Sequence, residues 1–445
     1  MTEITAHAGE LRRTLRLGDL VLAQILVIVG LSSIGPAARL GSFHWAYWLL
    51  GIALFQVPLA IVVMHLTRAM PLEGGPYQWA RAAFGDFAGF MVAWNFWHFI
   101  IVFLSMLGLT VAAGIGYASG ASEAWMSNRA WQIGVSAIVT LLLMVLAIAG
   151  LGAAKLLHDV ASLTLLLAVA VLIALPLFSS SPRVETAAGS FSLMQLVLFT
   201  RIAVYALAGL ECMAILIGEC RGGARAVTKS IAVAVPFIGA TYILGTHSVL
   251  TFIAPKDVDQ INPVAQAFSI ALRPFGSIAA IAVACAIFLL VARDFAQSSQ
   301  AFAAMTRMPL VAGWDHLVPQ WFTRLQPRTR TPVNAILFAG AATFACSFAA
   351  ILFAARQEAF QILLNTAGVL FAITYIVMFT IPLRTPAPRH VRAAALSGLA
   401  VTIAFLILTF VPIVPVASPA RYAMVIGVVV AVVNGVGAAV FRGFR

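Results

Sequence analysis

Charged side chains are scarce in this 445-residue chain: they make up 9% of the residues, whereas hydrophobic residues make up 62%. A soluble domain carries roughly 25% charged residues. The deficit excludes a soluble fold and indicates a chain that lies mostly in lipid. No linker and no low-complexity stretch divides the sequence, so we expect one integral membrane domain.

Cysteine is also scarce, and its four positions predict unpaired thiols rather than a disulfide framework or a metal site: Cys212, Cys220, Cys285 and Cys346. The sequence has no His-x-x-x-His spacing and no paired carboxylates within one apolar block, so we expect neither an enzyme nor a bound metal or cofactor. Residues 1–17 are polar and predict no cleavable signal peptide.

Apolar residues occur in blocks of about twenty, the length that crosses a bilayer as a helix. These blocks lie at 19–40, 45–69, 84–118, 129–149, 158–179, 191–218, 230–254, 277–304, 332–355, 359–383, 392–414 and 420–441. They predict an all-α integral membrane protein with about twelve transmembrane helices.

The basic residues predict the orientation of the chain. With the N-terminus inside, the segments expected in the cytoplasm carry 18 Lys and Arg residues and the outer segments carry 7. Cytoplasmic loops are enriched in these residues, so we expect both termini in the cytoplasm. Topology also accounts for the net charge of +12, and we expect no nucleic-acid partner.

Two of the apolar blocks are interrupted. The block 191–218 carries Gly209 and Glu211 near its centre, where an ionisable group costs about 2.5 kcal/mol or more. The first block is broken at Gly30, Gly35 and Pro36. Interrupted helices in the two halves of a chain are the best sequence indication of a transporter's binding site.

Three segments carry a resemblance to a known family. Glu73-Gly74-Gly75-Pro76-Tyr77 with Phe84-Gly85 is similar to a Glu/Ala-Gly-Gly-x-Tyr…Phe-Gly signature. Tyr205 to Glu211 resembles an aromatic-Ala-aromatic-x-Gly-x-Glu break. A third segment resembles Arg-x-Pro…Asp…Leu-x-Pro…Thr-Pro-Val, and its matching residues are Arg307, Pro309, Asp315, Pro319 and Thr331-Pro332-Val333. The chain therefore resembles the amino acid–polyamine–organocation permease superfamily.

This resemblance implies a leucine-transporter-type fold with a five-plus-five inverted repeat. Residues 1–18 form a cytoplasmic segment, 19–383 a transport core whose repeats are 19–179 and 191–383, and 392–445 two peripheral helices with a cytoplasmic C-terminus. The implied function is a secondary active transporter, a permease or an exchanger, for amino acids or related small amines. It acts by alternating access in the cytoplasmic (inner) membrane. The alternative is a non-transporting receptor or scaffold of the same fold.

The implied substrate site lies between the two interrupted helices. Amides and hydroxyls of the first span attract anionic groups, and free carbonyls of the sixth attract cations. The residues concerned are Ser32, Ser33, Gly35, Tyr205, Ala206, Leu207 and Gly209. Pro36 stands where the family has a further amide; proline has no N–H, so the usual carboxylate clamp is incomplete or displaced.

The resemblance also assigns roles in gating and coupling. Tyr205 matches a gating aromatic ring, with a packing tyrosine as the alternative. Glu211 is either a proton-responsive carboxylate or a structural acid that satisfies the unwound backbone. Trp97, Ile101 and Ser105 share one face of a predicted helix at i, i+4 and i+8. The family places substrate contacts on this face, although packing is the alternative.

Intramembrane charges in the eighth span are the least expected feature. Arg293 and Asp294 are adjacent, and adjacent helical residues point about 100° apart, so we expect that they do not simply neutralise each other. They are either functional or form a lock with another span, for example with Glu211 or Asp159. Ser298 shares a face with Asp294 and, with Ser299, is a candidate ligand for a coupling cation.

Coupling and partners stay open. Proton-coupled members often have a lysine deep in span five, where this chain has leucines at 165–167, so proton, sodium or no coupling ion remains possible. Arg201 either lines the outer vestibule and selects anionic groups or snorkels outward. The expected partners are a small-molecule substrate and the lipid bilayer, with the protein a monomer or a homodimer.

Overall fold

The computed structural model describes residues 16–70, 75–149, 151–178, 192–215, 220–272, 276–311, 320–327, 329 and 331–443. Helices lie in all twelve predicted apolar blocks, and the described residues contain no β-strand. Nine helices of the described part are long and apolar enough to cross a membrane, or ten with one bent pair. The all-α membrane class is confirmed. The count of twelve, the inverted repeat and the domain boundaries stay predictions.

The first half of the described chain ends with the long helix α10. Its elements are α1 (Leu17–Ile28), η1 (Leu31–Ser33), α2 (Ile34–Ala38), η2 (Gly41–Phe43), α3 (His44–Gly51), the π-helix η3 (Ile52–Gln56), α4 (Val57–Ala69), α5 (Pro76–Phe84), α6 (Asp86–Leu104), α7 (Leu107–Ser119), α8 (Glu123–Met126), α9 (Arg129–Ala149) and α10 (Leu151–Phe178).

The second half begins with the other interrupted helix. Its elements are α11 (Leu193–Arg201), the π-helix η4 (Ile202–Ala206), α12 (Cys212–Ile215), α13 (Gly223–Phe252), η6 (Pro255–Asp257), α14 (Pro263–Ala271), α15 (Gly276–Val311), α16 (Gln320–Thr323), α17 (Val333–Phe353), α18 (Arg356–Arg384), α19 (Arg389–Leu408) and α20 (Pro419–Gly443).

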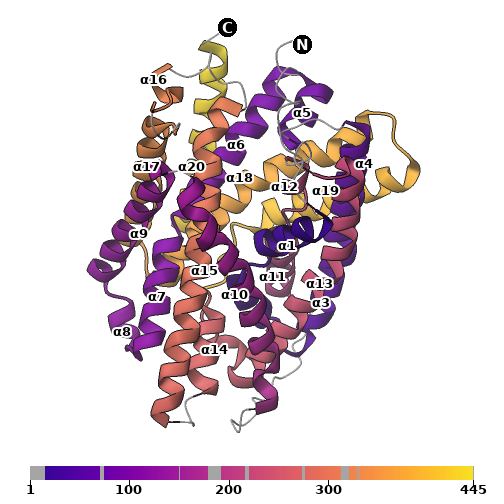
Figure 1. Ribbon diagram of the computed structural model, residues 1–445. Helices are drawn as coiled ribbons and strands as arrows, with labels where there is room; N and C mark the ends of the chain where they lie inside the picture. Colours follow the sequence, from indigo (N-terminus) through magenta and orange to yellow (C-terminus); the bar gives the residue numbers. More distant parts are fainter. Residues whose placement is uncertain are drawn as a thin grey trace.

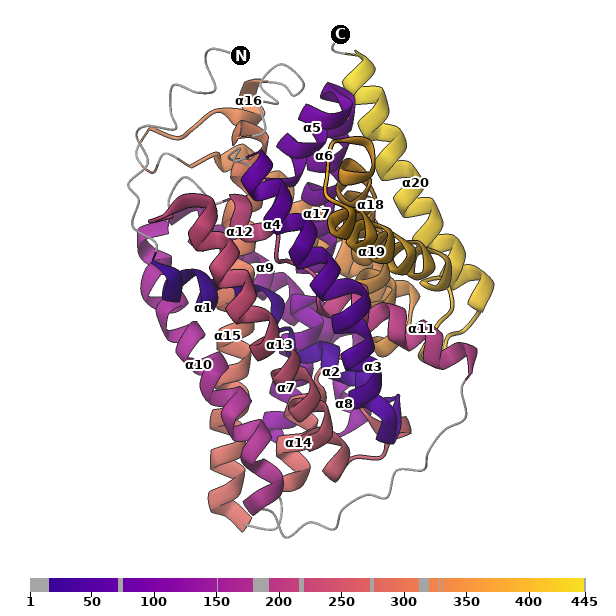
Figure 2. The same ribbon diagram turned by 90° about the vertical axis from the view of Figure 1, so that its right-hand side faces the viewer.

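Several long helices, among them α9, α10, α13 and α15, run along the long direction of the molecule, whereas α18 and α19 cross it obliquely (Figure 1). α5, α16 and the end of α20 lie at one end, and α8 and α14 lie toward the other in both views (Figures 1 and 2). Large apolar side chains are exposed on the outer helices, including Ile138, Phe288 and Met424. A soluble monomer rarely exposes so much contiguous apolar surface, so these faces fit a lipid environment.

Both predicted interruptions are present as breaks in the backbone. α1 and the helical segment Leu31–Ala38 are bent by 50° at the break between them. Pro36 is tolerated because it lies in the first turn of α2, where a backbone N–H lacks an intrahelical partner. In the second break, η4 leads into residues 207–211, where Gly209 has φ +110°.

The connection before α14 packs onto the second part of the first span. A Cβ atom added at Gly35 would lie 3.1 Å from the Asp259 carbonyl oxygen and 3.2 Å from Gln260 Cα. Asp259 accepts hydrogen bonds from Arg356 (3.2 Å) and from the Tyr117 hydroxyl (2.7 Å). Glycine at position 35 therefore permits a close approach that fixes α2 against this connection.

Candidate functional site

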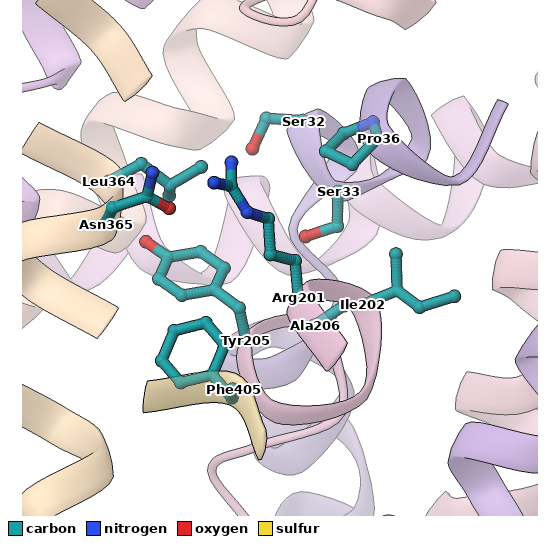
Figure 3. A pocket seen from close by; sticks show the side chains of 10 residues that line it. All are labelled: Ser32, Ser33, Pro36, Arg201, Ile202, Tyr205, Ala206, Leu364, Asn365 and Phe405. Carbon is teal, nitrogen blue, oxygen red and sulfur yellow. The ribbon is translucent and has the colours of Figure 1, made fainter. Parts of the chain in front are cut away.

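A small cavity lies between the first interrupted helix and η4. Its volume is about 20 Å³, room for about one water molecule. The residues that line it come from the two broken helices, from α18 and from α19: Ser32, Ser33, Pro36, Arg201, Ile202, Tyr205, Ala206, Leu364, Asn365 and Phe405 (Figure 3). The cavity is too small for an amino acid, so a substrate larger than water needs the surrounding helices to separate.

The break in the first span is bridged by a tyrosine hydroxyl from α13. Tyr242 Oη accepts a hydrogen bond from the Gly30 N–H (3.0 Å) and donates one to the Ile28 carbonyl (2.8 Å). The Trp48 ring stacks on Tyr242 with centroids 4.5 Å apart. The Gly30 N–H also donates to the Ile28 carbonyl (2.8 Å), so the Tyr242 hydroxyl reinforces a tight backbone turn at the break.

A second tyrosine hydroxyl, from α18, bridges the break in the sixth span. Tyr375 Oη accepts from the Gly209 N–H (3.0 Å) and donates to Glu211 Oε1 (2.8 Å). Glu211 is 1% exposed. The carboxyl group is therefore tied to the unwound backbone through Tyr375, an arrangement compatible with both the structural and the proton-responsive role.

Side chains of α15 bind the carbonyl groups at the end of α1. Arg293 Nη2 donates to the Val29 carbonyl (2.6 Å) and to the Leu26 carbonyl (3.3 Å). Gln297 Nε2 donates to the carbonyls of Leu26 (2.9 Å) and Val27 (3.2 Å). A cation at a helix C-terminus is favourable because the last carbonyls are unpaired and carry partial negative charge.

The expectation that Arg293 and Asp294 do not neutralise each other is wrong. Arg293 Nη1 lies 2.6 Å from Asp294 Oδ1. The 100° separation fixes only the direction in which each side chain leaves the helix, and the long arginine side chain reaches back to its neighbour. Glu211 bonds to Tyr375 instead of forming the alternative lock, and the side chain of Asp159 lies outside the described residues.

Tyr205 lines the cavity near Gly368 of α18 and Phe405 of α19. A Cβ atom added at Gly368 would lie 2.9 Å from Phe405 Cζ and 3.4 Å from Tyr205 Cδ2, so glycine allows both rings to approach α18. The Tyr205 hydroxyl is buried without a hydrogen-bond partner among the described residues. In Figure 3 it points toward Asn365, and the Arg201 guanidinium extends into the space between Ser32 and Leu364.

The sequence matches the amino acid permease family over residues 20–436. That match covers most of the chain. The chain belongs to the amino acid permease family. It is thus a member of the amino acid–polyamine–organocation superfamily, a transporter family, as the sequence motifs indicated. This membership implies that the protein crosses the membrane several times and handles a small-molecule substrate.

Relatives of this permease are also named as transporters. An uncharacterized transporter of Legionella pneumophila is 23% identical over 398 residues, which cover 87% of this chain and 84% of the relative. One of Mycobacterium tuberculosis is 26% identical over 450 residues, covering 95% and 91%. A probable agmatine/putrescine antiporter of Lactococcus lactis is 27% identical over 77 residues, covering 17% and 16%.

The structure of this permease brings some of the predicted binding residues to the cavity. Ser32, Ser33, Tyr205 and Ala206 line it. The other residues predicted from the two breaks are not among the residues that line the cavity: Gly35, Leu207, Gly209 and Glu211. The functional roles of all these residues stay predictions.

The predicted face of the third span lies elsewhere. Trp97 Nε1 donates to the Met305 carbonyl (3.2 Å), and its ring stacks on Phe338 of α17. Ile101 is buried in the same apolar cluster. The Ser105 hydroxyl bonds to the Val102 carbonyl (2.6 Å) where α6 gives way to α7. The structure does not bring these three residues to the cavity, and a binding role for them stays a prediction.

The structure describes the predicted cation ligands Ser298 and Ser299, but it describes two of the family motifs only in part. Ser298 is buried on α15, and Ser299 donates to the Ala296 carbonyl (2.8 Å). Residues 71–74 and 312–319, which carry parts of two family motifs, lie outside the described residues.

Sequence reasoning missed the residues that α18 and α19 contribute to the cavity. Asn365 is a polar residue in an apolar block, and this signal could have identified it. Leu364 and Phe405 carry no such signal, because the chain has 30 phenylalanines and many more leucines in similar contexts. Phe405 belongs to α19, which the sequence placed outside the ten-helix core.

Proposed function

We propose that this permease is a secondary transporter that moves amino acids or related small amines across the cytoplasmic membrane by alternating access. The observation that carries the proposal is the cavity between two interrupted helices, the arrangement in which transporters of broken-helix type bind their substrates. The name of the Lactococcus relative supports exchange as one mode of transport, although it matches only a short part of the chain.

A receptor or scaffold of the same fold is the second candidate. Pro36 lines the cavity and has no amide to offer a substrate carboxylate, which favours loss of transport. Purified protein in proteoliposomes separates the two functions. A transporter accumulates or exchanges a labelled amino acid, whereas a receptor is stabilised by the ligand without moving it.

We also propose that transport is not coupled to a sodium ion bound at the end of α1. Arg293 and Gln297 donate to the carbonyls of Leu26, Val27 and Val29, so these oxygens are occupied by protein donors. A fixed guanidinium also repels a second cation at this place. Transport is then driven either by exchange of one substrate for another or by proton coupling through Glu211.

Replacing Tyr205 with alanine tests the gate. We expect Tyr205→Ala to fold but to retain substrate poorly, with uptake reduced about tenfold, the effect of about 1.4 kcal/mol. The reason is that the ring lies against Phe405 and Gly368 at the edge of the cavity. Uptake kinetics in proteoliposomes measure the effect. Tyr205→Phe keeps the ring and serves as the control; wild-type kinetics in the alanine variant exclude a gating role.

Glu211→Gln tests proton coupling. Its side-chain oxygen still accepts from Tyr375, so we expect the variant to fold while the pH dependence of uptake becomes flat. Tyr375→Phe is the control: it removes the hydrogen bonds to Gly209 and Glu211, lowering the free energy of unfolding by about 1 kcal/mol per bond, but keeps the pH dependence. Reduced stability of Glu211→Gln with an unchanged pH profile assigns Glu211 a structural role instead.

A further inference from the structure

The cavity contains one arginine, Arg201, which is 4% exposed. Its guanidinium points into the space between Ser32 and Leu364, and the Ser33 hydroxyl lies beside the aliphatic part of its side chain (Figure 3). Arg201 therefore does not snorkel to the membrane surface. It is the only charged residue among those that line the described cavity.

The hydrogen-bond partners of Arg201 are all uncharged. Nη1 donates to Gln361 Oε1 (3.0 Å), and Nη2 donates to the carbonyls of Thr409 (3.2 Å) and Val411 (2.6 Å). The Tyr422 hydroxyl also contacts the guanidinium. Nε is buried and has no hydrogen-bond partner within the described ranges.

Other buried arginines of the described chain are neutralised by acids. Arg293 pairs with Asp294, and Arg356 pairs with both Glu123 and Asp259. Arg201 forms no ion pair within 4 Å with any described carboxylate, including Glu358 one turn before Gln361 on α18. An isolated buried charge is costly, so an incoming anion gains unusually strong attraction at this position.

We propose that Arg201 binds a substrate carboxylate and that the substrate carries a net charge of −1, as an acidic amino acid does. This inference rests on the transport function proposed above and narrows its substrate class. A zwitterion leaves the site with its charge of +1, and a cationic amine raises it to +2. An acidic amino acid neutralises it, and its second carboxylate replaces the interaction that Pro36 cannot provide.

Three polar groups around Arg201 complete the carboxylate site. Ser32 and Ser33 place hydroxyls on one side, of which that of Ser33 also hydrogen-bonds to Tyr242. The buried hydroxyl of Tyr205 lies on the other side and has no hydrogen-bond partner among the described residues. Hydroxyl donors and a guanidinium together suit a carboxylate, which accepts several hydrogen bonds at once.

A structural role for Arg201 is the competing explanation. Its bonds to Thr409 and Val411 attach the end of α19 to the core, and this attachment alone needs no substrate. The two roles make different predictions about ligand charge. Loss of a structural attachment weakens every ligand equally, whereas loss of a carboxylate-binding group changes the preference between charged and uncharged ligands of one shape.

The test uses the full-length protein with three probes: L-glutamate, its uncharged analogue L-glutamine, and putrescine. Thermal stabilisation in detergent and uptake into proteoliposomes are measured for wild type, Arg201→Gln and Arg201→Lys. We expect wild type to prefer L-glutamate over L-glutamine by at least about tenfold and to reject putrescine. In Arg201→Gln, affinity for L-glutamate falls about 100-fold, equivalent to about 2.8 kcal/mol, while that for L-glutamine is unchanged or higher.

Arg39→Gln is the matched control. Arg39 also donates to the connection after α19, at the Ile413 carbonyl, but it does not line the cavity. We expect this variant to keep the preference for L-glutamate. Arg201→Lys keeps the charge, and we expect it to retain part of that preference even if the attachment of α19 is weakened.

Other outcomes overturn the inference in distinguishable ways. If wild type transports L-glutamine or putrescine as well as or better than L-glutamate, the transport function stands and the charge preference is wrong. Equal losses for L-glutamate and L-glutamine in Arg201→Gln make Arg201 a structural residue. If wild type neither binds nor transports any amino acid or amine tested, the proposed function fails, and the inference fails with it.

Discussion

Arg293→Met is expected to lower the free energy of unfolding by about 3–5 kcal/mol and to abolish transport, as removal of one member of a buried ion pair does. Two costs combine. Asp294 loses the guanidinium 2.6 Å away, and the Val29 carbonyl loses its side-chain donor, whereas the Leu26 carbonyl keeps the Gln297 amide. Only Gln297 then binds the end of α1 to α15, and we expect this contact alone to be too weak to hold the first broken helix in its half of the site.

Thermal unfolding in detergent and uptake into proteoliposomes measure this effect. Arg81→Met is the matched control, because Arg81 pairs with Asp86 where both side chains are about half exposed; such pairs contribute at most about 1 kcal/mol. We expect Arg293→Met/Asp294→Asn to be more stable than Arg293→Met, since it removes the unpaired acid. Wild-type stability and transport of Arg293→Met contradict a role for this guanidinium.

Added sodium provides a further check on the same site. Because Arg293 and Gln297 occupy the carbonyls at the end of α1, sodium is expected to change neither the melting temperature nor the uptake rate of the wild type. Potassium at equal ionic strength is the control. A specific sodium effect means that a cation binds despite the guanidinium, or at another place.

Gly209→Val is expected to cause the second large loss. Gly209 has φ +110°, a conformation that a β-branched residue adopts only with strain, at a cost of about 1–3 kcal/mol. A Cβ atom at this position also lies 3.1 Å from Ile28 Cγ1, at the point where the two broken helices meet. The distortion moves the Gly209 N–H away from Tyr375, so the break in the sixth span loses its bridge.

Thermal unfolding and uptake again give the readout, with Gly209→Ala as an intermediate substitution. Gly134→Ala in α9 is the control, because its added Cβ meets no atom within 4 Å and its backbone is helical. We expect the free energy of unfolding of Gly134→Ala to be unchanged or higher by about 0.5–1 kcal/mol. If Gly209→Val retains wild-type uptake, the conformation at this glycine is not needed for transport.

The positions of the helix breaks could be predicted because their causes are local. Gly30, Gly35 and Pro36 weaken a helix wherever they occur, and a glycine and a glutamate in an apolar block have no use in a simple span. Helices therefore formed in the predicted blocks and broke near the predicted residues. The family motifs indicated that the two breaks together form one substrate site. Local helix propensity says nothing about how two distant segments are arranged.

The partners of the charged residues could not be predicted in the same way. No sequence pattern connects Arg293 with carbonyls at the end of α1, more than 260 residues away. The prediction that Arg293 and Asp294 stay apart was wrong because backbone direction does not fix where the long, flexible arginine side chain ends. The spacing in the sequence showed that Trp97, Ile101 and Ser105 share one helix face. It did not show which helices pack against that face.

The sequence by itself determined the membrane class, the helical blocks, the two interruptions and the family, since these depend on composition, periodicity and short motifs. Only the tertiary structure decided that Arg201 points into the cavity without an acid partner in the described part of the chain, and that Asn365 and Phe405 from distant helices complete the lining. The physical reason is that a buried charge acquires its energy from the groups around it. Those groups come together only when helices remote in sequence pack against one another.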